Sequence, residues 1–238
     1  MCIRDKTVAM RNTQNSISMM QTTEGALDET TNILIRMKDL ATQAADGSSN
    51  TDDKTAMQSE FDALTQELTN IVGNTAFGGQ KLLSDTTGTF SATGGVKFQI
   101  GSSTAESMTV DLSTSAATMH ASILAAATGY VSSGVAATPA GTEITASASA
   151  TIDLLQTAID DVGTVRSALG AASNRLDHVY NNLANISTNT KAATGRIMDT
   201  DFATESSNMT SSQMLLQAGT AMLKQSNSTS SLVMSLLQ

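Results

Sequence analysis

The clearest pattern in the sequence is a seven-residue repeat of apolar side chains between residues 155 and 186. Two apolar positions recur in each repeat, which is typical of a helix that packs along a seam against other helices. The repeat consists of Leu155, Val162, Leu169, Leu176 and Leu183, interleaved with Ala158, Val165, Ala172, Val179 and Ile186. At about 1.5 Å per residue the seam is roughly 45 Å long, so we predict a rod-like bundle of long helices.

The N-terminal region carries the same kind of pattern twice. Residues 7–44 contain Leu27 and Leu34 seven residues apart and no proline, which predicts a long helix. A polar turn follows, and Thr51 or Asp52 is expected to cap a second helix that ends at Gly73. We expect the apolar residues of these two helices and of the seam to form the rod core. They are Leu27, Leu34, Phe61, Leu64, Leu68, Leu155, Val162, Leu169, Leu176 and Leu183.

The middle of the chain departs from the helical period. Apolar and polar residues alternate over 96–100 and again over 108–112, which predicts a β-hairpin. Residues 113–150 are mostly Ser, Thr, Ala and Gly, include the only proline and show no lasting period. We expect them to form a short irregular insertion at the surface.

A last helical region, near residues 202–237, carries apolar residues that no predicted neighbour covers. They are Leu216, Leu223, Leu232, Val233 and Leu236. The expected fold class is therefore mainly α, a rod-like bundle of helices with one β-hairpin and an irregular insertion. We divide the chain into N-terminal rod helices and hairpin (1–112), the variable insertion (113–150), the C-terminal rod helix (151–202) and a terminal helix (203–238).

Composition and charge exclude several classes of function. Only 40% of the 238 residues are hydrophobic and 3% are aromatic, so the core must be thin and aliphatic. The net charge is −9 and no run of Lys or Arg occurs, which argues against nucleic-acid binding. No apolar stretch is long enough for a membrane span, and the opening residues do not form the apolar core of a cleaved leader. The single Cys2 excludes an internal disulfide.

Candidate chemistry is sparse. His120 falls in the insertion and His178 on the long seam helix, where a solvated side chain is the expected state rather than a catalytic one. The adjacent acids at 52–53 and 160–161 point about 100° apart on a helix, so they do not form a carboxylate pair. The acids at 199 and 201 lack the glycine and glutamate of a calcium loop. We predict no catalytic site, metal site or cofactor, and hence no enzyme.

Three blocks of the sequence resemble bacterial flagellins. They are QTTEGAL at 21–27 with RMKDLATQ at 36–43, GNTAFGGQKLL at 73–83, and RIMDTDFATE at 196–205 with QAGTAML at 217–223. The likeness covers about residues 7–112 and 151–238 in the family's order. The chain is therefore identified as similar to the subunit of the flagellar filament.

The resemblance implies a fold, a location and partners. It implies packed helices with a β-hairpin, export through the flagellar type III channel without a cleaved leader, and an extracellular filament that serves motility. The chief partner is the chain itself in a helical homopolymer, in which the terminal helix packs in the filament core. A flagellin export chaperone and the flagellar cap and junction proteins are the further partners implied.

The resemblance also implies a recognition surface. Arg36, Leu40 and Glu67 match positions that an animal Toll-like receptor contacts in many flagellins. Lys38 stands where the family commonly has Arg, a change that removes the planar fork of the guanidinium. These positions are the candidate receptor contacts of this chain.

The chain also departs from the family, and two other interpretations exist. Flagellins normally begin with a further helix-forming stretch, so we expect this chain to lack that N-terminal helix. A hook-filament junction protein shares both terminal regions, but would match the blocks at 21 and 217 less well. A coiled-coil signalling module of the chemoreceptor kind has alanine-rich heptads, but would lack the hairpin and need a membrane anchor.

Overall fold

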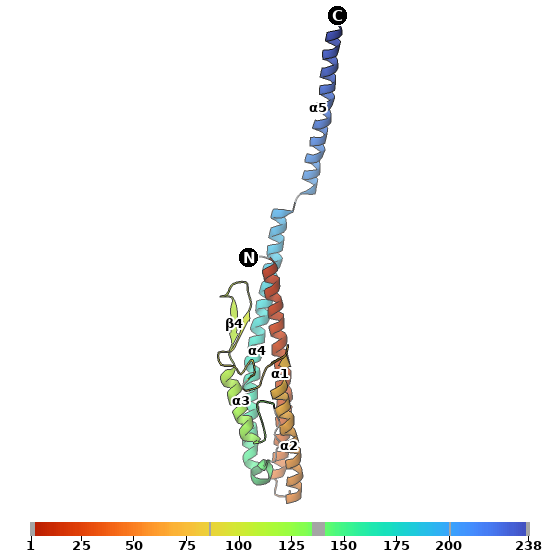
Figure 1. Cartoon of the computed structure of the whole chain (residues 1–238). Coiled ribbons are helices and arrows are strands. Elements are labelled where there is room, and N and C mark those ends of the chain that lie inside the picture. The colour runs from red at the N-terminus through yellow and green to blue at the C-terminus, as the bar shows by residue number, and fades with distance from the viewer. Residues whose placement is uncertain (1–2, 86, 135–140, 200, 237–238) are drawn as a thin grey trace. The chain divides into compact units, whose positions relative to one another are not determined.

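The computed structural model describes residues 3–85, 87–134, 141–199 and 201–236 (Figure 1). The chain forms two compact units, Met1–Ser187 (unit 1) and Thr188–Gln238 (unit 2), and the boundary lies within a helix. The helices are α1 (Ile3–Ala45), α2 (Thr51–Asn74), α3 (Ser113–Ala126), α4 (Glu143–Met198) and α5 (Phe202–Leu236). The strands are β1 (Ala76–Phe77), β2 (Gln80–Lys81), β3 (Val96–Gln99) and β4 (Ser107–Val110).

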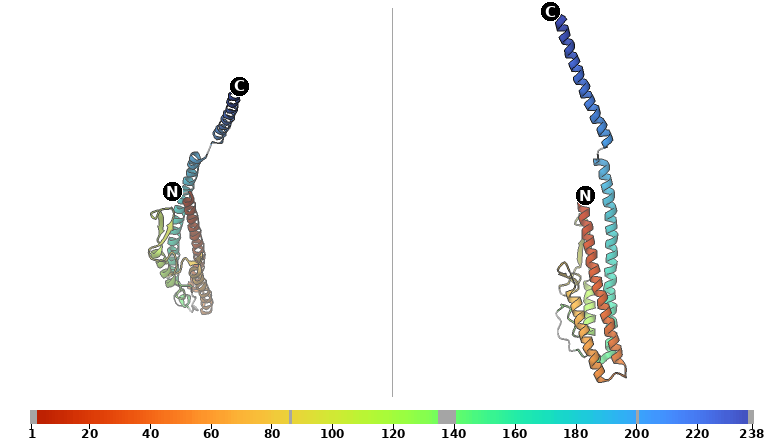
Figure 2. Two further views of the ribbon diagram at one scale, coloured as in Figure 1. Left: turned by 45° about the horizontal axis from the view of Figure 1, so that its top comes forward. Right: turned by 90° about the vertical axis from the view of Figure 1, so that its right-hand side faces the viewer.

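Within unit 1, α4 runs antiparallel to α1, and polar contacts fix their register. Arg166 of α4 forms an ion pair with Asp28 of α1 at 2.9 Å. Ten residues further along α1, Lys38 Nζ donates to Oε1 of Gln156, which is ten residues earlier on α4, at 2.6 Å. The two views of Figure 2 show the helices side by side. Between these two contacts α1 and α4 therefore keep a single register.

The core of unit 1 follows the heptad positions of α1, α2 and α4. All ten residues assigned to the rod core lie inside, nine of them buried, while Leu64 is half-buried and packs against the buried cluster. Small polar residues of α1 are buried at the same period. The hydroxyls of Thr13, Thr23 and Thr30 each donate to the carbonyl four residues earlier, at 2.8–2.9 Å. These bonds satisfy the hydroxyl group, so Thr fits between closely packed helices.

The cap of α2 is Asn50, so the prediction of Thr51 or Asp52 is wrong by one or two residues. The Asn50 side chain accepts a hydrogen bond from the Asp53 backbone N–H at 2.9 Å, and the Asp53 carboxylate accepts one from the Asn50 N–H at 3.2 Å. Two free N–H groups of the helix end are thereby satisfied reciprocally. A cap at Asn50 is favoured because only it places an acid three residues later.

Two small antiparallel strand pairs lie between α2 and α3. The predicted hairpin is present, with β3 paired to β4 so that Phe98 faces Met108 across the ladder. A second pair, β1 with β2, was not expected. Its turn is Gly78-Gly79, and both glycines have positive φ (58° and 84°), as a two-residue hairpin turn requires.

The segment 113–150 differs from the expected irregular insertion. Residues 113–126 form α3, and α4 already begins at Glu143; Pro139 lies outside the described residues. Buried positions of α3 recur every three or four residues. They are Ala116, Met119, His120, Ile123 and Ala126. Because two of these five are alanine in an alanine-rich segment, the helical period is hidden in the sequence.

One buried side chain of α2 holds the start of α4. Gln58 Oε1 accepts from the Ile144 N–H at 2.8 Å, and Gln58 Nε2 donates to the Glu143 carboxylate at 2.9 Å. Glu143 also accepts from the backbone N–H and hydroxyl of Thr128 at 2.8 and 2.5 Å. Burial alone would raise the pKa of Glu143, but the hydrogen bonds from Thr128 and Gln58 outweigh it and lower that pKa. The first turn of α4 is thus fastened to α2.

We expect Leu169→Asp to lower the free energy of unfolding of unit 1 by about 4 kcal/mol, because a charge without a partner would replace a buried core side chain. Ser167→Asp adds the same charge at an exposed position two residues away and is the matched control. Thermal unfolding followed by circular dichroism measures both. Equal melting temperatures for the two variants would contradict the assignment of the seam as core.

Candidate assembly and recognition surfaces

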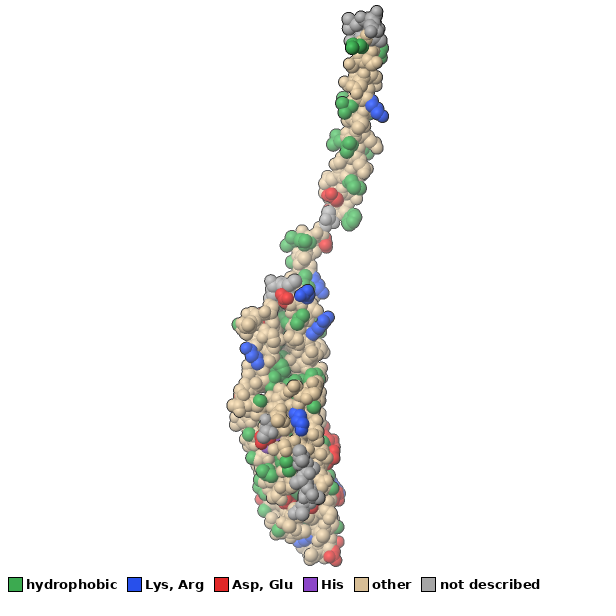
Figure 3. Space-filling model, viewed as in Figure 1, with side chains coloured by type: hydrophobic (Ala, Val, Ile, Leu, Met, Phe, Trp, Pro, Cys, Tyr) green, Lys and Arg blue, Asp and Glu red, His purple; other side chains and the backbone are tan. Residues whose placement is uncertain are grey.

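Helix α5 of unit 2 exposes large apolar side chains along its length, seen as separate hydrophobic groups in Figure 3. Their exposed fractions range from 59% to 85%. The stripe comprises Phe202, Met209, Leu215, Leu216, Met222 and Leu223, while Met214 and Leu232 are exposed on the other side of the helix. Four of these recur at seven-residue steps and the others precede them by one residue, so they share one face of the helix. An exposed apolar stripe of this length is typical of a surface that binds another protein.

The rest of α5 supports the same interpretation. Between residues 202 and 236 only Glu205 and Lys224 are charged, as in the core of a protein interface, where charges are depleted. Among the residues assigned to the terminal helix, Leu216, Leu223 and Leu232 are exposed. The side chains of Val233 and Leu236 lie outside the described part of the structure.

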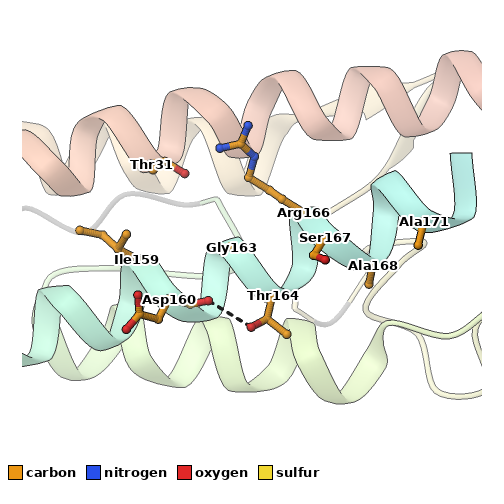
Figure 4. A pocket seen from close by; sticks show the side chains of 9 residues that line it. All are labelled: Thr31, Ile159, Asp160, Gly163, Thr164, Arg166, Ser167, Ala168 and Ala171. Atoms are coloured by element: carbon orange, nitrogen blue, oxygen red, sulfur yellow. Dashed lines mark hydrogen bonds between the residues drawn. The ribbon is translucent and has the colours of Figure 1, made fainter. Parts of the chain in front are cut away.

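A shallow groove of about 720 Å³ runs along α4 of unit 1 beside Thr31 of α1 (Figure 4). Small side chains line most of it, and a methyl group at Gly163 would meet no atom within 4 Å. Its charged groups are Asp160 and Arg166, and Arg166 is already paired with Asp28. The groove therefore holds no nucleophile beside a base, and its chemistry is that of a packing surface.

The candidate receptor contacts differ in exposure. Arg36 is 55% exposed, and its Nε and Nη2 donate to Glu60 Oε1 of α2 at 2.9 and 2.6 Å. Glu67 is exposed and lies two helical turns after Glu60, about 10 Å along the same face of α2. Arg36 and Glu67 thus lie on one surface of the α1–α2 pair.

Leu40 does not fit the same surface. Its side chain is 2% exposed and belongs to the core cluster of unit 1, so in this fold it is not part of the exposed surface that carries Arg36 and Glu67. The residue follows Met37 by three positions and precedes Ala44 by four, and both of these are buried on the seam of α1. Lys38 is half-buried and bonded to Gln156.

The two histidines have opposite environments. His178 is exposed, as expected. His120 is buried, and both its ring nitrogens are within hydrogen-bond distance of other groups, so the expectation of a solvated side chain is wrong. The sequence signal that could have shown this is the spacing of Met119 and Ile123 on either side, which puts position 120 on the buried face of α3.

The described residues contain neither a cluster of metal-ligating side chains nor a membrane-spanning helix. Within those residues, no group of three or more His, Cys, Asp or Glu side chains could hold a metal ion. In the same part of the chain, no helix is both long enough and apolar enough to cross a membrane.

Comparison with known sequence families finds two matches. Residues 2–87 match the bacterial flagellin N-terminal helical region, and residues 152–237 match the bacterial flagellin C-terminal helical region. Together they cover more than half of the chain. The N-terminal match begins at residue 2, a few residues before the resemblance noted in the sequence.

Individual proteins agree with these matches. The flagellin of Halalkalibacterium halodurans is 36% identical over 99% of this chain and 80% of its own length. That of Bacillus subtilis is also 36% identical, over 99% and 82%. The crystal structure of Bacillus cereus flagellin superposes with a TM-score of 0.56 at 31% identity, covering 77% of this chain and 94% of that one. The interpretation as a flagellin, a family of structural proteins, is confirmed. This chain belongs to the bacterial flagellins, the subunits that polymerise into the extracellular flagellar filament of motile bacteria.

Proposed function

We propose that α5 is the element through which this subunit enters the core of the filament. The observation that carries the proposal is the exposed apolar stripe on α5, together with the scarcity of charge on that helix. An isolated helix is marginal in water, so the stripe needs neighbouring helices both for burial and for a stable conformation. Copies of the same chain supply such helices, and contacts of this kind that do not close on themselves generate a filament.

The same stripe supports proposals on export and on further partners. A subunit that leaves the cell before it assembles must have its apolar surface covered until then, and a flagellin export chaperone would cover α5. Export would use the flagellar type III channel without cleavage of a leader. At the two ends of the filament, the cap and junction proteins would contact the terminal subunits. They would use the same surfaces through which subunits contact one another along the filament.

We expect the double variant Leu216→Asp, Leu223→Asp to reduce filament growth at least about tenfold, because burying charges without partners costs more than the 1.4 kcal/mol of one factor of ten. Both residues are exposed in unit 2 and contribute nothing to the core of unit 1, so the fold of unit 1 is retained. Growth from seeds of sheared flagellar filaments, counted by electron microscopy, measures the effect.

The matched control is Ser207→Asp, Ala221→Asp. It adds the same two charges at exposed positions on the side of α5 opposite the stripe. We expect it to grow filaments close to the parent rate. Equal growth of both double variants, or no growth by the parent chain, would contradict the proposal.

We further propose that the α1–α2 surface containing Arg36 and Glu67 is the one that an animal Toll-like receptor contacts. The observation that favours it is that both side chains are exposed and lie on one face. The guanidinium of Arg36 is held by an exposed ion pair, which contributes little stability and can be exchanged for a partner's carboxylate. Leu40 would act by packing beneath this surface rather than by contact.

We expect Arg36→Ala to weaken receptor binding by about tenfold, since arginine is prominent among residues that dominate interfaces. Glu67→Ala is expected to act in the same direction. Asp52→Ala, at an exposed position in the first turn of α2, is the control. Binding of the monomer to the immobilised receptor ectodomain, with circular dichroism to verify the fold, is the measurement. Identical affinities for all variants, or no binding by the parent chain, would refute the assignment.

A further inference from the structure

A buried histidine of α3 joins three segments of unit 1. His120 is 5% exposed, its Nε2 lies 2.8 Å from the Leu83 carbonyl oxygen, and its Nδ1 lies 2.7 Å from the Tyr130 hydroxyl. The two rings are stacked, with centroids 6.1 Å apart. Leu83 belongs to the segment after β2, and Tyr130 to the loop that follows α3. Among the described residues, His120 is the one whose side chain contacts both Leu83 and Tyr130.

The polarity of these bonds defines one state of the ring. A carbonyl oxygen only accepts hydrogen bonds, so Nε2 of His120 carries a hydrogen and donates it to Leu83. In the neutral ring Nδ1 is then an acceptor, and the Tyr130 hydroxyl donates to it. The neutral Nε2–H tautomer therefore satisfies both partners at once.

Tyr130 is in turn anchored to α2. Next to it, the backbone N–H of Val131 donates to the Thr69 hydroxyl at 3.2 Å. At the end of the same loop, Gly134 has a φ of +79° and packs so closely on Gly73 that a Cβ on Gly73 would lie 2.0 Å from the Gly134 Cα. His120 thus connects α3, through this loop, to the C-terminal part of α2, against which the loop packs closely.

Protonation of His120 conflicts with this arrangement. A hydrogen on Nδ1 would point at the Tyr130 hydroxyl hydrogen, so the hydroxyl would have to turn its hydrogen away and accept from the ring instead. The charge of the ring would then lie between two buried side chains. The charged and titratable groups facing the ring are few. Helix α3 and the described part of the following loop carry no Asp, Glu, Lys or Arg. Tyr130 is the titratable group nearest to the ring. The segment of β2 and the residues after it contribute two more, Lys81 and the exposed Asp85, and Lys81 Nζ donates to the Ser133 carbonyl oxygen at 3.3 Å.

Burial lowers the pKa of His120, although the charge of Asp85 and the bond to Leu83 act in the opposite direction. The unfolded chain therefore takes up a proton near the ordinary value of about 6.5, before the folded one does. The contribution of His120 to stability is complete above that pH and is lost as the pH falls toward the folded value. A cavity of about 420 Å³, lined by Asp85, Leu124 and Tyr130, opens beside the ring and gives water a path to it.

We infer that His120 is an acid-sensitive latch, which fastens α3 and the loop 127–134 to the segment after β2 while the ring is neutral and releases α3 when the ring is protonated. Release would expose the apolar face of α3, including Met119 and Ile123. The latch involves neither α5 nor the side chains of Arg36 and Glu67, so it does not rest on the proposals on filament assembly and on receptor recognition.

The two histidines of the chain make a matched experiment possible. Hydrogen exchange of the full-length chain gives protection factors for the α3 amides, corrected for the intrinsic effect of pH. We expect protection at 116–126 to fall at least about threefold between pH 7.5 and pH 5, in step with protonation of His120 seen by NMR. His120→Gln keeps a donor for Leu83 without a titrating group, and we expect it to lose the pH dependence. His178→Gln removes the exposed histidine and is expected to behave like the parent.

A third variant tests the role of the tyrosine. Tyr130→Phe removes the donor that favours neutral Nδ1, so the pH at which α3 loses protection is expected to rise. Unchanged protection of the parent between the two pH values would overturn the inference. So would a loss that persists in His120→Gln, or a transition that Tyr130→Phe leaves in place.

Discussion

Burial of the apolar residues of the antiparallel helices α1 and α4 in one common core is the constraint on which unit 1 depends. Two cross-helix contacts ten residues apart, Asp28 with Arg166 and Lys38 with Gln156, show that a single register is kept. Exposed pairs of this kind contribute little energy, so the burial of the seam provides the stability and the pairs report the alignment. The hairpin, α2 and α3 are placed by their contacts with this pair and with one another.

Close packing of α1 against α2 restricts the size of the side chains that α1 buries. Threonine and alanine occupy many buried positions of α1, and the threonine hydroxyls bond back to their own helix. Such a core buries less apolar surface per residue than one of leucine and phenylalanine, which fits the low aromatic content of the chain. The length of the seam compensates for the small apolar area buried per residue, because each further helical turn buries additional apolar surface without requiring larger side chains.

The two units show two ways of meeting the same physical demand. In unit 1, apolar faces are covered by other parts of the chain, and buried polar groups such as Gln58 and His120 find partners from distant segments. In unit 2, the described apolar face of α5 is exposed. This difference between the units suits a filament subunit, because an apolar surface that is exposed in the monomer is available for contact with other copies of the chain.

The sequence by itself determined the features that depend on local periodicity and on family motifs. The heptads of α1, α2 and α4, the alternation of β3 and β4, and the flagellin blocks were all readable, because a repeated apolar spacing reports the face that a helix or strand buries. Helix α3 was not predicted, because alanine is only weakly hydrophobic and gives no clear apolar period, although it packs well in a core. The exact cap of α2 depended on one side chain three residues away.

Only the tertiary structure decided which polar side chains meet across the chain. Leu40 lies in a matched recognition motif, but its place on the seam buries it. His120 lies 37 residues from Leu83 and 10 from Tyr130, and no pattern in the sequence joins them. Hydrogen bonds are directional and short, so their partners are set by how distant backbones pack. Periodicity in the sequence predicts which face of its own helix or strand a residue occupies. It does not predict which residues of other segments will contact that face.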